Sequence, residues 1–130
     1  MYCLDTNIII ELFSENRSVI RRIEDLEKAS ASLWTTPITL CELYKSVFGA
    51  RNFQTKAAAV AQATSRVGLL AFDEQSARDY GKLHATLRRK GMFTGEADLM
   101  IAAICKAHGK ILITRNPQHF KNTGIQLEAW

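Results

Sequence analysis

The chain has 130 residues, 47% of them hydrophobic, with only 7 glycines and 2 prolines. This composition excludes a disordered chain, and the length predicts one domain, residues 1–130, around one hydrophobic core. The formal net charge of +4 is compatible with a polyanionic partner but does not establish one.

No apolar run approaches the roughly 20 residues that a membrane-spanning helix needs. Asp5 and Glu11 interrupt the N-terminal segment, so we expect no secretory signal, no membrane contact and a protein that works in the cytoplasm. The three cysteines are widely spaced and odd in number, which argues against a disulfide framework. Cys3 and Cys105 lie in apolar runs and are expected to be buried thiols.

Predicted strands alternate with predicted helices along the chain. The strands are expected over residues 1–4, 33–35, 69–72 and 110–114, with a short fifth over 125–127. The helices are expected over residues 6–14, 18–29, 37–48, 52–66, 74–90 and 97–107. This alternation predicts an α/β fold with three α/β/α layers, in which helices cover both faces of a central parallel sheet of four to five strands.

Local signals refine two of these helices. Thr6 or Asn7 is expected to cap the first helix, because both residue types accept hydrogen bonds from free backbone amides. In the helix that begins at Pro37, the side chains of Cys41, Tyr44 and Phe48 recur at helical spacing and predict its apolar face.

Polar side chains gather where predicted strands end and helices begin. Asp5 ends the first strand, Asn116 follows the fourth, and Glu42 lies early in the helix after the second. Asp98 opens a helix that is apolar on nearly every side, and Glu96 precedes it by two positions. Because the carboxyl ends of parallel strands share one edge of a sheet, we expect these side chains to face one crevice.

Carboxylates brought together in this way repel one another unless a cation joins them. Mg²⁺ and Mn²⁺ favour oxygen ligands, and the chain has no Cys/His cluster at zinc spacing. Such an ion can activate water for attack on a phosphodiester. Asp5, Glu42 and Asp98 are therefore the predicted metal-binding and catalytic residues.

Each acidic residue also has a purely structural interpretation. Asp5 could only cap the following helix, and Glu42 could pair with Lys45 on an exposed face. Asp98 and Glu96 could stabilise the start of their helix through its dipole. The joint placement of the carboxylates, more than any one of them, carries the prediction.

Basic residues cluster near predicted helix ends. They are Arg88, Arg89 and Lys90, and separately Arg17, Arg21 and Arg22. For any single cluster a solvated surface is the simpler explanation, but in an RNA-binding protein Arg88, Arg89 and Arg115 are the best candidates for phosphate contacts. The histidines, His84, His108 and His119, have no partner at catalytic or metal-ligand spacing, and we assign them no role.

Four segments of the chain, residues 4–9, 39–43, 95–103 and 112–120, resemble the PIN-domain ribonucleases, in particular the VapC toxins of bacterial toxin–antitoxin pairs. The resemblance implies a PIN-like fold with Asp5, Glu42 and Asp98 at the family's acidic metal-binding positions. Asn116 falls where many PIN domains carry a fourth acidic residue, and Glu96 is a candidate replacement for that carboxylate.

The resemblance also implies the surroundings and partners of the site. Thr6 and Thr114 match small polar positions that could orient ligands or waters. The implied cofactor is Mg²⁺, with Mn²⁺ as a substitute, and the implied substrate is structured RNA, with tRNA favoured. The implied partners are a second copy of the chain and a VapB-type antitoxin, with operator DNA bound only through the antitoxin.

Two other functions are compatible with parts of the sequence. A strand-end aspartate with Mg²⁺ also describes phosphotransfer domains, but phosphatases of that kind need a second aspartate at the position of Asn7. A receiver domain would have to use Asp73, which leaves Glu42 and Asp98 unexplained. The other alternative to a ribonuclease is a binding module that keeps the fold without catalysis.

Overall fold

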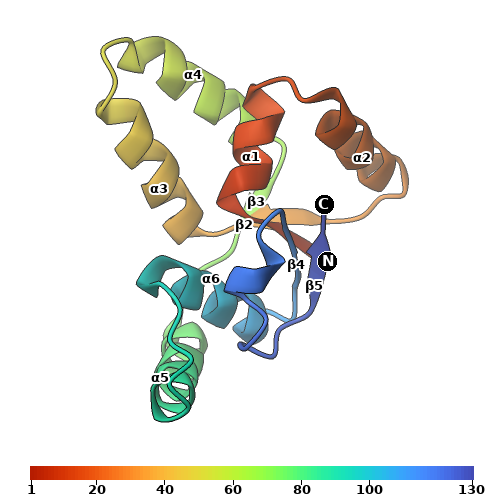
Figure 1. The fold of residues 1–130 in the computed structure, drawn as a ribbon. Helices are drawn as coiled ribbons and strands as arrows, with labels where there is room; N and C mark the ends of the chain where they lie inside the picture. The colour runs from red at the N-terminus through yellow and green to blue at the C-terminus, as the bar shows by residue number, and fades with distance from the viewer.

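The computed structural model describes all of residues 1–130. Its helices are α1 (Thr6–Phe13), α2 (Arg17–Lys28), α3 (Pro37–Phe48), α4 (Phe53–Thr64), α5 (Glu74–Arg89) and α6 (Glu96–Ala107), with a 3₁₀ turn η1 (Pro117–His119). Its strands are β1 (Tyr2–Leu4), β2 (Leu33–Thr35), β3 (Gly68–Leu69), β4 (Ile111–Thr114) and β5 (Leu127–Ala129). Strands and helices alternate through most of the chain (Figure 1), as the sequence predicts.

The five strands form one parallel sheet in the order β3-β2-β1-β4-β5. The short β1 strand is central, with Cys3 opposite Trp34 on β2 and opposite Leu112 on β4. The predicted parallel α/β sheet is therefore confirmed. Because β1 and β4 are neighbours, residues that follow them in the chain meet at the same edge of the sheet, although about 110 positions separate them.

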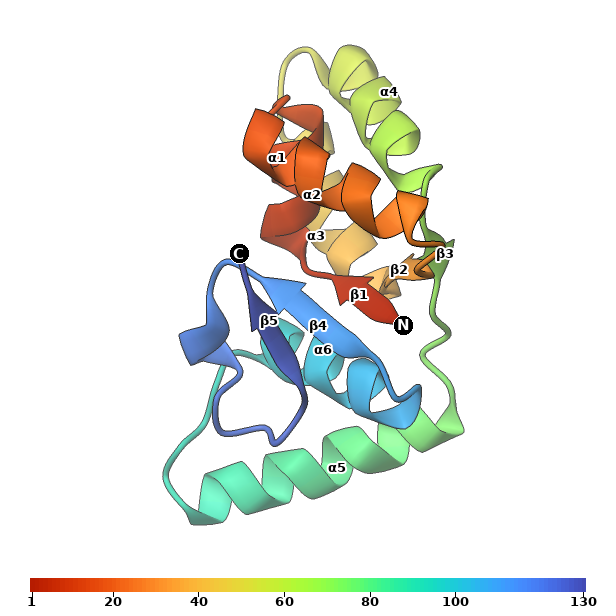
Figure 2. The same ribbon diagram turned by 90° about the vertical axis from the view of Figure 1, so that its right-hand side faces the viewer.

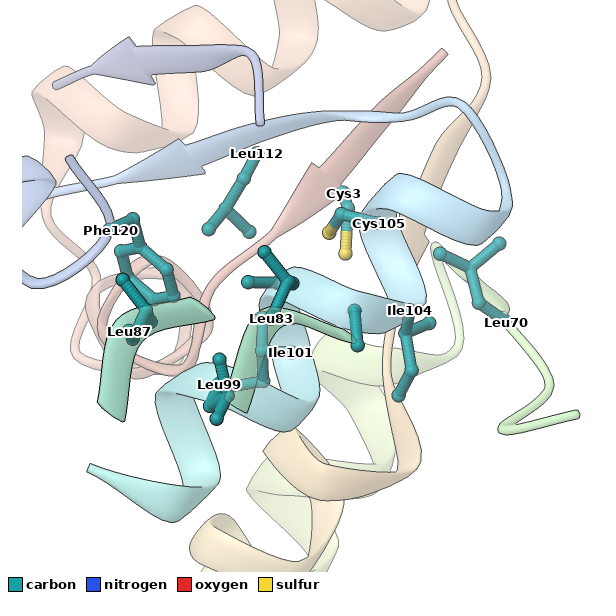
Figure 3. Close-up of a cluster of buried hydrophobic side chains, with 12 residues drawn as sticks. Cys3, Leu70, Leu83, Leu87, Leu99, Ile101, Ile104, Cys105, Leu112 and Phe120 are labelled. Carbon is teal, nitrogen blue, oxygen red and sulfur yellow. The ribbon is translucent and has the colours of Figure 1, made fainter. Parts of the chain in front are cut away.

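Two hydrophobic clusters pack against the opposite faces of the sheet. Successive residues of a strand point to opposite faces, so Leu4 and Ile113 join the cluster covered by α1, α2, α3 and α4. Cys3 and Leu112 face the other cluster, with side chains from α5 and α6 (Figure 3). Figure 2 shows the resulting three layers, with α1 to α4 on one side of the sheet and α5 and α6 on the other.

Two strands have bounds that differ from the predicted ones by one to three residues. The third strand covers 68–69 rather than 69–72, because Gly68 pairs with Trp34 and the chain then turns towards α5. The fifth covers 127–129 rather than 125–127, because Leu127 is the residue that pairs with Leu112. Register in a sheet is decided by the neighbouring strand, and the chain's own pattern carries little of that information.

Two local predictions are wrong. Asp5, rather than Thr6 or Asn7, is the N-cap of α1. On α3 the buried face consists of Thr39, Leu43 and Val47, whereas Cys41 is exposed and Phe48 is 65% exposed. The predicted face, Cys41, Tyr44 and Phe48, also recurs at helical spacing, so the periodicity alone could not choose between two apolar stripes.

The prediction that Cys3 and Cys105 are buried thiols is confirmed. Cys3 and Cys105 are both fully buried between β1 and α6, and Figure 3 shows their sulfur atoms side by side. No helix is both long enough and apolar enough to span a membrane.

Candidate active site

A polar cleft lies at the carboxyl edge of the sheet, next to the first turns of α1 and α6 and the second turn of α3. It has a volume of about 260 Å³. Its lining residues are Asp5, Thr6, Asn7, Ile10, Glu42, Asp98, Asn116 and His119. Ile10 is the one apolar side chain among them, so the cleft is suited to a charged or strongly polar ligand.

Asp5 is the most buried carboxylate of the cleft, with 5% of its surface exposed. Its Oδ1 accepts a 2.8 Å hydrogen bond from the Thr6 amide, and its Oδ2 accepts a 2.7 Å bond from the Thr114 hydroxyl. Burial raises the pKa of Asp5, the two hydrogen bonds oppose that shift, and the charges of Asp98 and Glu42 add to it. Asp5 therefore caps α1 and also presents a desolvated, oriented carboxylate to the cleft.

Glu42 reaches the cleft from α3, where its side chain is half-buried. The Thr6 hydroxyl donates a 2.7 Å hydrogen bond to Glu42 Oε1. Thr6 thus bonds Asp5 through its backbone amide and Glu42 through its side chain, which fixes the two carboxylates relative to each other. Glu42 bonds Thr6 rather than Lys45, so the exposed-pair explanation of Glu42 does not hold.

Asp98 lies in the first turn of α6, and 26% of its side chain is exposed. Its Oδ2 is 3.3 Å from Nδ1 of His119, which the turn η1 carries into the cleft. Burial raises the pKa of Asp98, His119 lowers it and the charge of Glu42 raises it further. The sequence interpretation missed His119, because no fixed spacing links an aspartate that starts one helix to a histidine in a later turn.

Asn116 also lines the cleft, after the end of β4. Its backbone amide donates a 3.0 Å hydrogen bond to the Thr114 hydroxyl, which itself bonds Asp5. On the other side, the Arg115 amide donates a 3.3 Å bond to Asn7 Oδ1. Two hydrogen bonds therefore link the end of β4 to the residues that follow β1.

The structure places Glu96 outside the cleft, so in this structure it does not stand in for a fourth carboxylate. The Tyr80 hydroxyl of α5 donates a hydrogen bond to Glu96 Oε2, and His84 Nε2 lies 3.9 Å from Glu96 Oε1. Residues two apart at the start of a helix point in different directions, so Asp98 faces the cleft while Glu96 faces α5.

The basic candidates lie outside the cleft. Arg88 and Arg89 are exposed at the end of α5, and Arg115 is exposed beside the cleft with its guanidinium 2.9 Å from Glu11. The second basic cluster, Arg17, Arg21 and Arg22, lines a separate hollow on α2.

The donor atoms of the cleft fit a hard cation. Asp5, Glu42, Asp98 and Asn116 offer oxygen ligands, the nitrogen-bearing groups include His119 and the Asn116 amide, and no cysteine lines the cleft. The side chains do not already form a cage of three or more metal ligands. Mg²⁺ does not need such a cage, because it commonly takes one or two carboxylates and completes its shell with water and substrate phosphate.

Asp73, the residue that a receiver-type phosphotransfer site would need, does not line the cleft. Asp73 is the N-cap of α5, where its carboxylate accepts hydrogen bonds from the Ser76 amide and hydroxyl. His108 Nε2 is 3.5 Å from Asp73, and these contacts give that aspartate a structural role away from the cleft.

Comparisons with known proteins agree on one family. The PIN domain model matches residues 2–125. The chain is 34% identical to ribonuclease VapC1 of Haemophilus influenzae, over 100% of this chain and 98% of that protein. It is 33% identical to a tRNA(fMet)-specific endonuclease VapC of Salmonella typhimurium, over 99% of this chain and 97% of that protein.

Solved structures give the same result at the level of the fold. The crystal structure of VapBC2 from Rickettsia felis, bound to a DNA fragment from its promoter, matches with a TM-score of 0.93 and 28% identity, covering 99% of this chain and 98% of that chain. The family match and the match to relatives over their full length lead to one conclusion: the chain belongs to the PIN-domain family, among its VapC ribonucleases.

Proposed function

We propose that this chain is the toxin of a VapBC-type toxin–antitoxin pair and that it is a Mg²⁺-dependent endoribonuclease acting in the cytoplasm. The observation that carries the proposal is the convergence of Asp5, Glu42 and Asp98 in one cleft, in a chain that belongs to the VapC ribonucleases. The substrate that we propose is structured RNA, with tRNA favoured, because the Salmonella typhimurium relative is named for tRNA cleavage.

Asp5, Glu42 and Asp98 are the residues that would hold Mg²⁺, with Mn²⁺ as a possible substitute. Burial raises the pKa of both Asp5 and Asp98, so a cation beside them would favour their ionised forms. Bound there, Mg²⁺ would supply an activated water for in-line attack on a phosphodiester and would neutralise the charge that develops on the phosphate.

The surrounding polar residues orient the carboxylates of this site before RNA binds. Thr114 and the Thr6 amide direct the two oxygens of Asp5, and the Thr6 hydroxyl directs Glu42. His119 compensates part of the charge of Asp98 in the free protein, and a bound cation would replace it in that role. The Asn116 amide group offers the cleft an oxygen ligand or a hydrogen-bond donor without adding a fourth negative charge.

A second groove adjoins the cleft and is a suitable place for the antitoxin. It has a volume of about 340 Å³, and its lining includes the apolar side chains of Ile10, Phe13, Leu43 and Val47. Ile10 and Glu42 line both the groove and the cleft. We propose that an apolar segment of a VapB-type antitoxin binds this groove, that the toxin forms a homodimer, and that operator DNA is contacted only through the antitoxin.

Incubation of the purified chain with total RNA tests the proposed activity. With Mg²⁺ we expect discrete cleavage products, and an excess of chelator should abolish them. The Asp5→Asn variant should give no products under either condition, because it retains the shape of the side chain but removes the charge that the cation needs.

Equal cleavage by wild type and Asp5→Asn would overturn the proposed mechanism. Release of phosphate from small phosphomonoesters would favour a phosphatase instead. Expression of the chain alone should also arrest growth of a bacterial host, and expression of Asp5→Asn at the same level should not.

A further inference from the structure

The connection between α5 and α6 carries an exposed aromatic surface that the proposed chemistry does not use. Phe93 is 51% exposed and Met92 is 48% exposed. The Phe93 ring meets the His84 ring edge-on, with centroids 5.5 Å apart and an interplanar angle of 78°. The His84 ring is in turn 5.8 Å from that of Tyr80, so a short row of rings supports Phe93 from the side of α5.

A hydrogen bond and a short stretch of chain connect this surface to the cleft. The Thr94 hydroxyl donates a 3.0 Å hydrogen bond to the backbone carbonyl of His119, whose ring contacts Asp98. Five residues of chain lead from Phe93 to Asp98, which limits their separation to about 18 Å. Figure 1 shows this connection leading from the end of α5 to the start of α6. An RNA strand that lies in the cleft and follows this connection towards α5 would reach Phe93.

Positive charge accompanies the exposed ring. Arg88, Arg89 and Lys90 immediately precede the connection, and all three are exposed. The cleft itself is lined by carboxylates, which repel a phosphate backbone, so cations beside it are needed to attract RNA. Aromatic rings next to cations are typical of single-stranded nucleic acid sites.

We propose that Phe93, supported by His84, stacks against an unpaired base of the RNA near the cleaved phosphodiester, while Arg88 and Arg89 neutralise neighbouring phosphates. The proposal rests on the proposed function, and it extends that function by naming a substrate element: an unpaired nucleotide beside the cleavage site. A ring stacks on any base, so Phe93 would position the strand, and it would contribute little preference for sequence.

The chain offers a matched control at the other end of α5. Phe72 is 39% exposed, but it is followed by Asp73 and Glu74 instead of preceded by cations. Because α5 has 16 residues, its ends are about 24 Å apart. Phe72→Ala removes a similar exposed ring from a surface that we do not expect RNA to contact.

The test measures binding of an oligoadenylate of about 12 nucleotides containing 2-aminopurine, in chelator so that the RNA stays intact. We expect quenching of the 2-aminopurine fluorescence on binding, and an affinity about tenfold lower for Phe93→Ala. Phe93→Trp should retain the affinity, and Phe72→Ala should match wild type. Phe93→Ala should leave the salt dependence unchanged, while Arg88→Gln and Arg89→Gln should each reduce its slope by about 0.7.

The binding assay decides this inference, and RNA cleavage by wild type with Mg²⁺ separately decides the proposed function. Unchanged binding and quenching by Phe93→Ala would overturn the stacking role even if the wild type cleaves RNA. Sedimentation provides a second test. If Phe93→Ala changes the mass of the protein in solution while RNA binding stays intact, the ring contacts a second copy of the chain, and the stacking role is overturned.

Discussion

The Thr114 hydroxyl donates a 2.7 Å hydrogen bond to Oδ2 of Asp5, across 109 positions of the chain. The bond exists because β4 lies beside β1 in the sheet, so the residue that ends β4 meets the residue that follows β1. Both groups are almost fully buried. Thr114 therefore holds one oxygen of Asp5 in place and stabilises its charged form in an environment that otherwise disfavours it.

Replacement of Thr114 by valine should reduce RNA cleavage without leaving a cavity in the core. Valine keeps the shape but loses the hydroxyl, so Asp5 loses a hydrogen bond to its charged form and its pKa should rise further. We expect RNA cleavage to fall about 10-fold to 100-fold, as for other residues that orient a metal ligand. Thr114→Ser should restore most of the rate, and the loss in Thr114→Val should be greater at lower pH. A loss that does not depend on pH and is not rescued by serine would indicate a packing role alone.

The Asp5→Asn variant should fold and, without metal, be as stable as wild type or more so. Asn retains the cap on Thr6, and the loss of the Thr114 bond, about 1 kcal/mol, is offset by removal of a buried charge. Because the pKa of Asp5 is raised in the folded protein, its protonation favours folding, and this benefit is lost as the pH rises through that pKa.

The relative stability of Asp5→Asn should therefore depend on pH. In chelator, urea unfolding at about pH 7 and about pH 4 should give a difference in favour of the variant at the higher pH that shrinks at the lower one. A large fall in its melting temperature at both values would show that Asp5 is chiefly a helix cap.

Glu96 and Glu42 should behave differently in matched substitutions. Glu42 lines the cleft and bonds Thr6, whereas Glu96 is turned towards Tyr80. We expect Glu42→Gln to reduce kcat/KM for RNA at least about tenfold. Glu96→Gln should change it by no more than about twofold, as is usual for an exposed position. Equal losses in the two variants would mean that Glu96 turns into the cleft when RNA is bound.

His119 should compete with the cation for Asp98. Its Nδ1 lies 3.3 Å from Asp98 Oδ2, so the imidazole and a cation would contact the same carboxylate. His119→Ala should therefore lower the Mg²⁺ concentration needed for half-maximal cleavage by about threefold. A higher Mg²⁺ requirement in the variant would mean instead that the imidazole helps to hold the metal.

The sequence was sufficient to predict that Asp5, Glu42 and Asp98 share the cleft, because the rule for parallel sheets depends only on where strands end, but it also placed Glu96 there, which the structure does not. Asp5, Asn116 and Asp98 each adjoin such an end or the start of a helix, and that information is local. Glu42 needed the additional step of placing a helix that begins at Pro37, which the structure bears out.

The direction of individual side chains was not predictable in the same way. Glu96 is turned by Tyr80, which precedes it by 16 residues on another helix, and His119 is carried into the cleft by a single 3₁₀ turn after Pro117. Both depend on contacts between segments that are distant in sequence. A hydrophobic pattern reports the exposed and buried faces of one element, and it carries no information about such contacts.

Cation binding by the isolated protein tests the central claim most directly, with Mn²⁺ as a paramagnetic substitute for Mg²⁺ observed by electron paramagnetic resonance. Wild type and Glu96→Gln should bind the ion equally. Asp5→Asn and Asp98→Asn should each bind at least about tenfold more weakly, because each removes a proposed ligand from the cleft. Equal binding by all four proteins would contradict the assignment of this cleft as the metal site of the ribonuclease.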